Sequence, residues 1–134
     1  MFIRIARMVA YGLIAALAAV AIGSGIGGMI GGPSGPAGDA AVESNYRFLS
    51  AFLLAAGVVL AWCLFRFRTA TVPLRIVCAT VLAGGIARLF AIPDTGAPDA
   101  AYTAFIIAEI AGPLAIVALH AVVTGGRFGS TRVG

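Results

Sequence analysis

Lysine is missing from this chain of 134 residues, and all nine of its basic residues are arginine. Without a lysine amine, no side chain can form the Schiff base by which retinal or pyridoxal is attached. Histidine is almost missing as well, and the single histidine, His120, excludes a bis-histidine haem within one chain. The sequence accordingly gives no reason to assign a cofactor, a metal ligand or a catalytic residue.

Charge is also scarce, because charged residues make up 10% of the chain against about 25% in a typical soluble domain. Hydrophobic residues make up 61%, and four apolar runs are long enough, or nearly so, to cross a hydrocarbon core of about 30 Å. The sequence predicts an all-α fold, an integral membrane four-helix bundle. We expect one transmembrane domain over residues 1–124, followed by a mobile cytoplasmic tail over 125–134. The expected spans are residues 8–28, 48–65, 74–92 and 101–123.

The few charges are segregated by sign along the four-span arrangement. One side carries only arginines, namely Arg4, Arg7, Arg66, Arg68, Arg75, Arg127 and Arg132. The other side carries all five acids and two arginines, namely Asp39, Glu43, Arg47, Arg88, Asp94, Asp99 and Glu109. The positive-inside rule then predicts a multi-pass protein of the inner (plasma) membrane with both termini cytoplasmic, N-in/C-in. The basic face predicts attraction to anionic lipid head groups at the cytoplasmic surface and no nucleic-acid partner.

The first apolar run could belong to a cleaved signal peptide, but it is longer than the 7–15 apolar residues of such a peptide.

The second half of the first apolar run is rich in glycine, and Gly23 to Gly28 match the pattern G-x-G-x-x-G. A dinucleotide site also needs a preceding strand, which the sequence does not predict. The pairs Gly23/Gly27, Gly27/Gly31 and Gly28/Gly32 instead predict close helix packing. The helix that packs there could be intramolecular, a second copy in a homo-oligomer, or a partner membrane subunit.

A polar cluster is predicted towards the outer face. Arg88 lies in an otherwise apolar helix, where an arginine costs about 2.5–3.5 kcal/mol on insertion scales and therefore needs a partner. Glu109 in the next run is the best candidate, and Arg47 is an alternative donor. The candidate binding cluster comprises Asn45, Arg47, Gly84, Gly85, Arg88, Glu109 and Pro113.

Two details refine this cluster. Gly84 and Gly85 precede Arg88 by four and three residues, so they lie on its helix face and leave a groove for a side chain or a ligand. Pro113 follows Glu109 by four residues, which removes the hydrogen bond to the Glu109 carbonyl and kinks the helix. The pair could fix helix register, bind a ligand, handle protons or serve catalysis.

Helix ends and the remaining reactive groups are predicted from local patterns. Asp39 and Asp99 each precede an apolar run and are expected to cap the helix that follows. Cys63 and Cys78 are expected to be small packing residues on the cytoplasmic side rather than a disulfide. His120 is expected to be an interfacial histidine near a helix C-terminus.

The arrangement of these residues resembles a bacterial family of small four-helix membrane proteins, domain of unknown function family 4345. The matching residues include Asn45-Tyr46-Arg47-Phe48, Pro73-Leu74-Arg75, Gly84-Gly85-Ile86-Ala87-Arg88-Leu89, Gly96-x-Pro98, and Glu109 followed by Gly112-Pro113. The resemblance covers about residues 8 to 123 and implies membrane location and four helices. It implies no activity. The layout is more distantly similar to DoxX-type four-helix proteins, at the level of the fold only.

The leading hypothesis is a non-enzymatic inner-membrane protein, either an accessory subunit or a bundle that binds lipid or a small molecule through the arginine–glutamate cluster. The alternative is a small transporter or proton-coupled carrier that uses Glu109. A membrane hydrolase using Asp94 and Asp99 is the third, although both acids come from one short loop and Asp99 already has a capping role.

Overall fold

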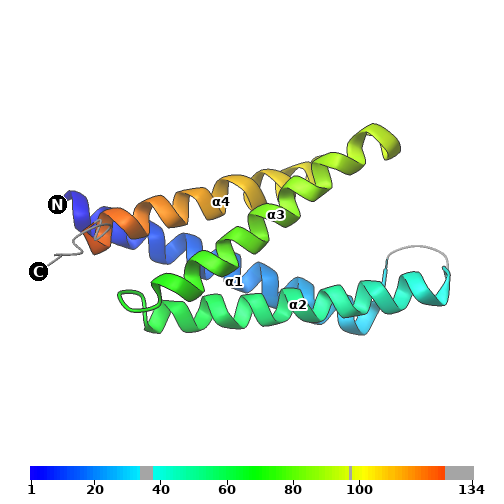
Figure 1. The fold of residues 1–134 in the computed structure, drawn as a ribbon, viewed down its shortest axis with the longest axis horizontal. Coiled ribbons are helices and arrows are strands. Elements are labelled where there is room, and N and C mark those ends of the chain that lie inside the picture. Colours follow the sequence, from blue (N-terminus) through cyan, green and yellow to red (C-terminus); the bar gives the residue numbers. More distant parts are fainter. Residues whose placement is uncertain (34–37, 97, 126–134) are drawn as a thin grey trace, which may run out of the picture. The chain divides into compact units, whose positions relative to one another are not determined.

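The computed structural model describes residues 1–33, 38–96 and 98–125, and these residues form four α-helices without a strand (Figure 1). The helices are α1 (Phe2–Gly31), α2 (Ala40–Phe65), α3 (Thr71–Thr95) and α4 (Ala100–Thr124). The all-α four-helix prediction is therefore confirmed, and each helix contains the expected span. Most of the predicted tail, from Gly126 to Gly134, lies outside the described residues.

The helix ends follow the predicted local chemistry. The Asp39 carboxylate accepts a hydrogen bond from the Ala41 N–H, and the Asp99 carboxylate accepts one from the Tyr102 N–H, at 2.9 Å each. Each carboxylate thus satisfies an N–H that has no partner within the helix. Gly125 ends α4 with a φ of +79°, in the left-handed region that glycine enters without steric cost. Both predicted N-caps are confirmed.

The end of α3 lies beyond residue 92, where the expected span ends. Pro93 lies inside the helix, which continues to Thr95 and ends at Gly96 with a φ of +82°. The φ of proline is fixed near the helical value, so the chain can continue as a helix through Pro93, although the hydrogen bond to the Leu89 carbonyl is lost and the ring crowds that carbonyl. The connection to α4 is consequently shorter than predicted, and Arg88 lies seven residues from the end of α3.

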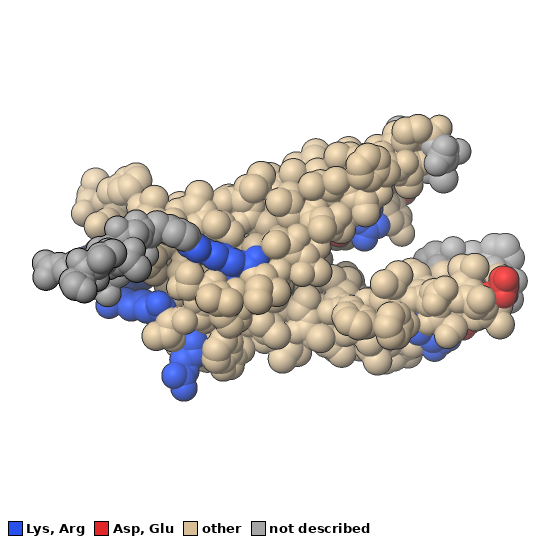
Figure 2. Space-filling view, in the orientation of Figure 1, with Lys and Arg blue, Asp and Glu red and all other residues tan. Residues whose placement is uncertain are grey.

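All four helices are long and apolar enough to cross a membrane, with mean hydropathies of 1.9 to 2.4 in their most apolar windows. Large apolar side chains such as Phe48, Phe52, Ile76 and Phe90 are exposed along them. Arginine and acidic side chains occupy small parts of the face shown in Figure 2, and most of the described remainder is neither basic nor acidic. Exposed apolar surface of this extent marks a membrane or partner interface, and the four helices indicate a multi-pass membrane protein.

Contacts divide the chain into two compact units, so the prediction of a single domain stays a prediction. The first unit contains Met1–Leu13 and the chain from Arg68 onward, including α3 and α4. These two helices pack against each other (Figure 1). On α4 the buried residues recur at helical spacing and form one face, and they are Ile106, Pro113, Ile116 and His120.

The second unit, Ile14–Phe67, contains the rest of α1 and all of α2. The two helix backbones approach closely because glycines lie where they meet. A Cβ added at Gly25 would lie 2.6 Å from the Leu54 nitrogen, and one at Gly57 would lie 2.8 Å from the Ile22 nitrogen. Close packing by the glycine-rich first helix is thus intramolecular at Gly25 and at the predicted Gly28, whose Cβ would meet Ser50, whereas a Cβ at Gly23, Gly27 or Gly31 would meet nothing within 4 Å among the described residues.

Candidate functional site

The first unit holds the ion pair that the arginine in the apolar helix requires. The Arg88 Nε donates a hydrogen bond to the Glu109 Oε2 at 2.8 Å, across 21 residues of sequence. The arginine side chain is 46% exposed and the glutamate side chain 21%. The expected pairing of Arg88 with Glu109 is therefore present, and the two formal charges cancel within an apolar pair of helices.

Gly85 is the residue that lets α4 come close enough for this pair. A Cβ at Gly85 would lie 3.0 Å from the Glu109 Cβ and from the Ile110 Cγ1, and 3.3 Å from the Glu109 carbonyl carbon. The space beside Gly85 is thus occupied by α4 itself. Of the two occupants predicted for the groove, a side chain or a ligand, the structure has the side chain. Gly84 is different, because a Cβ there would meet nothing within 4 Å among the described residues.

Two prolines lie close to the pair along the chain, one in each helix. Pro113 is fully buried inside α4 and Pro93 lies in the last turn of α3. A proline cannot donate to the carbonyl four residues earlier, so the Glu109 and Leu89 carbonyls lose their usual helical partners. Glu109 therefore offers both a carboxylate and a backbone carbonyl that helical bonding does not use, as predicted from Pro113.

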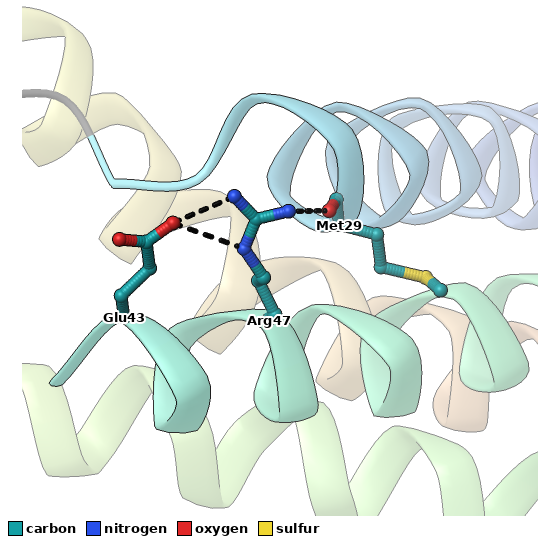
Figure 3. Close-up of polar contacts among 3 residues, drawn as sticks. All are labelled: Met29, Glu43 and Arg47. Atoms are coloured by element: carbon teal, nitrogen blue, oxygen red, sulfur yellow. Dashed lines mark hydrogen bonds and ion pairs between the residues drawn. The ribbon is translucent and has the colours of Figure 1, made fainter. Parts of the chain in front are cut away.

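Arg47 makes a different set of contacts in the second unit (Figure 3). Its Nη2 and Nε donate to the Glu43 Oε1 at 2.6 and 3.3 Å, and its Nη1 donates to the Met29 carbonyl at 2.8 Å. Met29 belongs to the last turn of α1, whose final carbonyls lack helical donors. Arg47 thus joins the end of α1 to the start of α2. The alternative in which Arg47 is the donor to Glu109 is not what the structure shows.

The Glu43–Arg47 pair has a signal in the sequence. A glutamate four residues before an arginine on a helix is the favoured orientation for an ion pair. The contact with Met29 had no such signal, because it depends on where the end of α1 lies relative to α2. Asn45, the remaining member of the predicted cluster, is exposed on α2.

The two arginines differ in how their nitrogen atoms are used. All three nitrogens of Arg47 have partners within the second unit. Arg88 donates through Nε alone among the residues that the structure describes, and Glu109 accepts there through Oε2 alone. The Arg88 Nη1 and Nη2 and the Glu109 Oε1 thus have no partner among those residues. A guanidinium has five N–H donors, so most of the donors of Arg88 remain available to a ligand.

His120 lies four residues before the end of α4, and its predicted position at the membrane interface stays a prediction. It is 1% exposed on the buried face of α4, and its carbonyl accepts a hydrogen bond from the Thr124 Oγ1 at 2.7 Å. A lone polar residue at helical spacing among apolar ones gives no signal that separates an interfacial from a buried position. Within the described part of the chain, no group of three or more histidine, cysteine or acidic side chains could hold a metal ion.

The comparisons with known proteins concern the whole bundle rather than any one residue. A search of curated proteins and a search of solved structures each gave no match. The more distant likeness to DoxX-type proteins therefore stays a prediction. The model of one family matches residues 9–120, which include α2, α3, most of α1 and α4, and the pair Arg88–Glu109. The predicted family is thereby confirmed, and the chain belongs to the family described as Domain of unknown function (DUF4345).

Proposed function

We propose that this protein is a non-enzymatic membrane protein that binds a lipid or a small amphiphile at the Arg88–Glu109 pair. The observation that carries the proposal is the single bond of Arg88 to Glu109 through Nε, which leaves the Nη atoms of a 46% exposed side chain without a described partner. Charge-assisted bonds from a guanidinium to a phosphate or carboxylate are strong and can be bidentate. No chemical step is assigned, because the pair offers charge and hydrogen bonds rather than a nucleophile activated by a base.

The depth of Arg88 suits a lipid head group. The 25 residues of α3 make a helix about 37 Å long, which exceeds a hydrocarbon core of about 30 Å by some 4 Å at each end if the helix is centred. Arg88 lies seven residues before Thr95, or about 10 Å along the axis, so its Cα is about 6 Å inside the core. An arginine side chain can span that distance and place its guanidinium at the interface.

The charge pattern supports a location and an orientation. Seven arginines and no acid fall on the side of the termini and of the connection between α2 and α3. The positive-inside rule assigns that side to the cytoplasm and the Arg88–Glu109 pair to the outer half of a bacterial inner membrane. The basic side would also attract anionic lipids of the cytoplasmic leaflet.

Lipid retained during purification tests the proposal. The wild-type protein and the variant Arg88→Gln are extracted in a mild detergent and examined by native mass spectrometry for bound lipid. Arg47→Gln is the matched control, because Arg47 lies in an outer segment of α2 and all three of its nitrogens have partners. We expect bound lipid on the wild type and on the control, and its loss from Arg88→Gln. Equal lipid on all three proteins would contradict the proposal.

A proton-coupled carrier is the second candidate, and the two prolines favour it. Interrupted helices near a membrane-embedded acid are a feature of secondary transporters, and Pro93 and Pro113 interrupt the bonding of α3 and α4 near Glu109. Reconstitution in vesicles that contain a pH-sensitive dye would show proton movement dependent on Glu109 if this candidate holds.

An accessory-subunit role, in which Gly23, Gly27 and Gly31 contact a second chain, would be seen in the detergent extraction described above. The protein would then be purified together with another protein or as a homo-oligomer.

A further inference from the structure

Both side chains of the Arg88–Glu109 pair have polar atoms that the bond between them does not use. On the arginine these are Nη1 and Nη2, and on the glutamate it is Oε1, none of which has a partner among the described residues. The pair thus offers donors that suit an anion beside an acceptor that suits a cation. These atoms lie on α3 and α4, which approach each other closely at Gly85.

Charge balance narrows the ligands that such a pair can take within a membrane. The pair is neutral as it stands, and an uncompensated charge in a low-dielectric medium is strongly disfavoured. A ligand with a net negative charge would leave the occupied site negative, and a cation alone would leave it positive. A ligand that carries one charge of each sign keeps the occupied site neutral and engages both side chains.

The surroundings of the pair indicate that such a ligand also has apolar chains. Phe105 lies one helical turn before Glu109 on the same face of α4 and is 45% exposed, and Ile86 and Leu89 on the adjoining surface of α3 are 41% and 43% exposed. These side chains would contact acyl chains, whereas they offer no hydrogen bond to a soluble metabolite. The ligand class is therefore a lipid rather than a soluble zwitterion.

We infer that the Arg88–Glu109 pair binds the head group of a phospholipid that carries a primary ammonium, such as phosphatidylethanolamine. The Arg88 Nη atoms donate to the phosphate, and the Glu109 Oε1 accepts an N–H from the ammonium. Phosphatidylcholine has the same net charge but a quaternary ammonium without an N–H, and phosphatidylglycerol has the phosphate without a cation. This inference rests on the proposed function and specifies its ligand.

The test measures binding of dioctanoyl forms of these three lipids to the purified protein by native mass spectrometry titration. We expect the wild type to bind phosphatidylethanolamine about five- to tenfold more tightly than either of the others, where tenfold corresponds to about 1.4 kcal/mol. Soluble glycerophosphoethanolamine, added as a competitor, should displace the lipid poorly. Equal affinities for the three lipids, or displacement by the soluble compound at equal concentration, would overturn the inference.

Two variants separate the roles of the two side chains. Glu109→Gln should lose the preference for phosphatidylethanolamine and gain affinity for phosphatidylglycerol, because Arg88 then keeps an uncompensated positive charge. Arg88→Gln should weaken the binding of all three lipids by about tenfold. Arg88→Lys keeps the charge without the planar fork, so it should retain part of the binding if Arg88→Gln fails to fold. An unchanged lipid ranking in Glu109→Gln would overturn the inference.

The outcomes distinguish this inference from the proposed function. If lipid binding depends on Arg88 but phosphatidylglycerol binds as well as phosphatidylethanolamine, the proposed function holds and the head-group assignment is wrong. If Arg88→Gln folds and binds every lipid as the wild type does, the proposed function itself is wrong. Arg47→Gln serves as the control in both cases, with thermal unfolding and size-exclusion profiles measured for each variant.

Discussion

Gly85 of α3 faces Glu109 of α4 so closely that a Cβ at Gly85 would lie 3.0 Å from the Cβ of Glu109. That separation is shorter than carbon atoms in ordinary contact adopt, at about 3.5–4.0 Å. The glycine therefore sets how near the carboxylate of Glu109 comes to Arg88, which lies one helical turn after Gly85 on the same face. Gly85, Arg88 and Glu109 thus contribute both to the packing of α3 against α4 and to the ion pair between the two helices.

Gly85→Ala should destabilise the protein, because the added methyl group meets the backbone of Glu109 as well as two side chains. Overpacking of this kind costs about 1–3 kcal/mol. Gly84→Ala is the matched control, since a Cβ there meets nothing within 4 Å and alanine favours a helix over glycine by about 0.5–1 kcal/mol. The midpoints of thermal unfolding in detergent should fall for Gly85→Ala and hold or rise for Gly84→Ala. Equal shifts for the two variants would contradict the close approach.

A similar comparison tests the contact of α1 with α2. Gly25→Ala should be more disruptive than Gly85→Ala, because its Cβ would lie 2.6 Å from a backbone nitrogen of Leu54, and a backbone atom cannot rotate away. We expect a loss of at least about 1–3 kcal/mol, measured as above. Gly23→Ala and Gly27→Ala meet nothing within 4 Å among the described residues, so like Gly84→Ala they should hold or raise the unfolding midpoint of the isolated chain. If these two variants instead dissociate an oligomer, the glycine face binds a second copy.

The Arg88–Glu109 pair should show strong coupling in a double-mutant cycle. Each of Arg88→Gln and Glu109→Gln leaves one charge without its partner in an apolar environment, whereas the double variant leaves none. Exposed pairs in water are worth about 0–1 kcal/mol. We expect a coupling of about 1–3 kcal/mol here, because lipid rather than water surrounds most of both helices. Additive losses in unfolding free energy would show that the pair contributes nothing beyond its separate side chains.

The sequence predicted the four helices because each contains a long apolar run, and local chemistry marks the beginning of two of them, at Asp39 and Asp99. It predicted the partner of Arg88 because an arginine in an apolar helix has few acids available. It did not predict that α3 continues past Pro93, since proline usually ends a helix and nothing local marks this one as tolerated. It also could not assign Arg47 to Met29, because that contact depends on tertiary placement of the end of α1.

Arg47 links the end of α1 to the start of α2 through the Met29 carbonyl and the Glu43 carboxylate. Arg47→Gln removes the bond to the Met29 carbonyl and the ion pair with Glu43, whereas Glu43→Gln removes only the charge of the pair. The side chains of Arg47 and Glu43 are 44% and 40% exposed, so the ion pair alone is worth about 0.3–0.5 kcal/mol. The carbonyl bond adds about 1 kcal/mol. Arg47→Gln should therefore lower the unfolding free energy more than Glu43→Gln, and amide hydrogen exchange should rise in the last turn of α1 for Arg47→Gln only. Equal exchange in both variants would mean that Arg47 does not hold the end of α1.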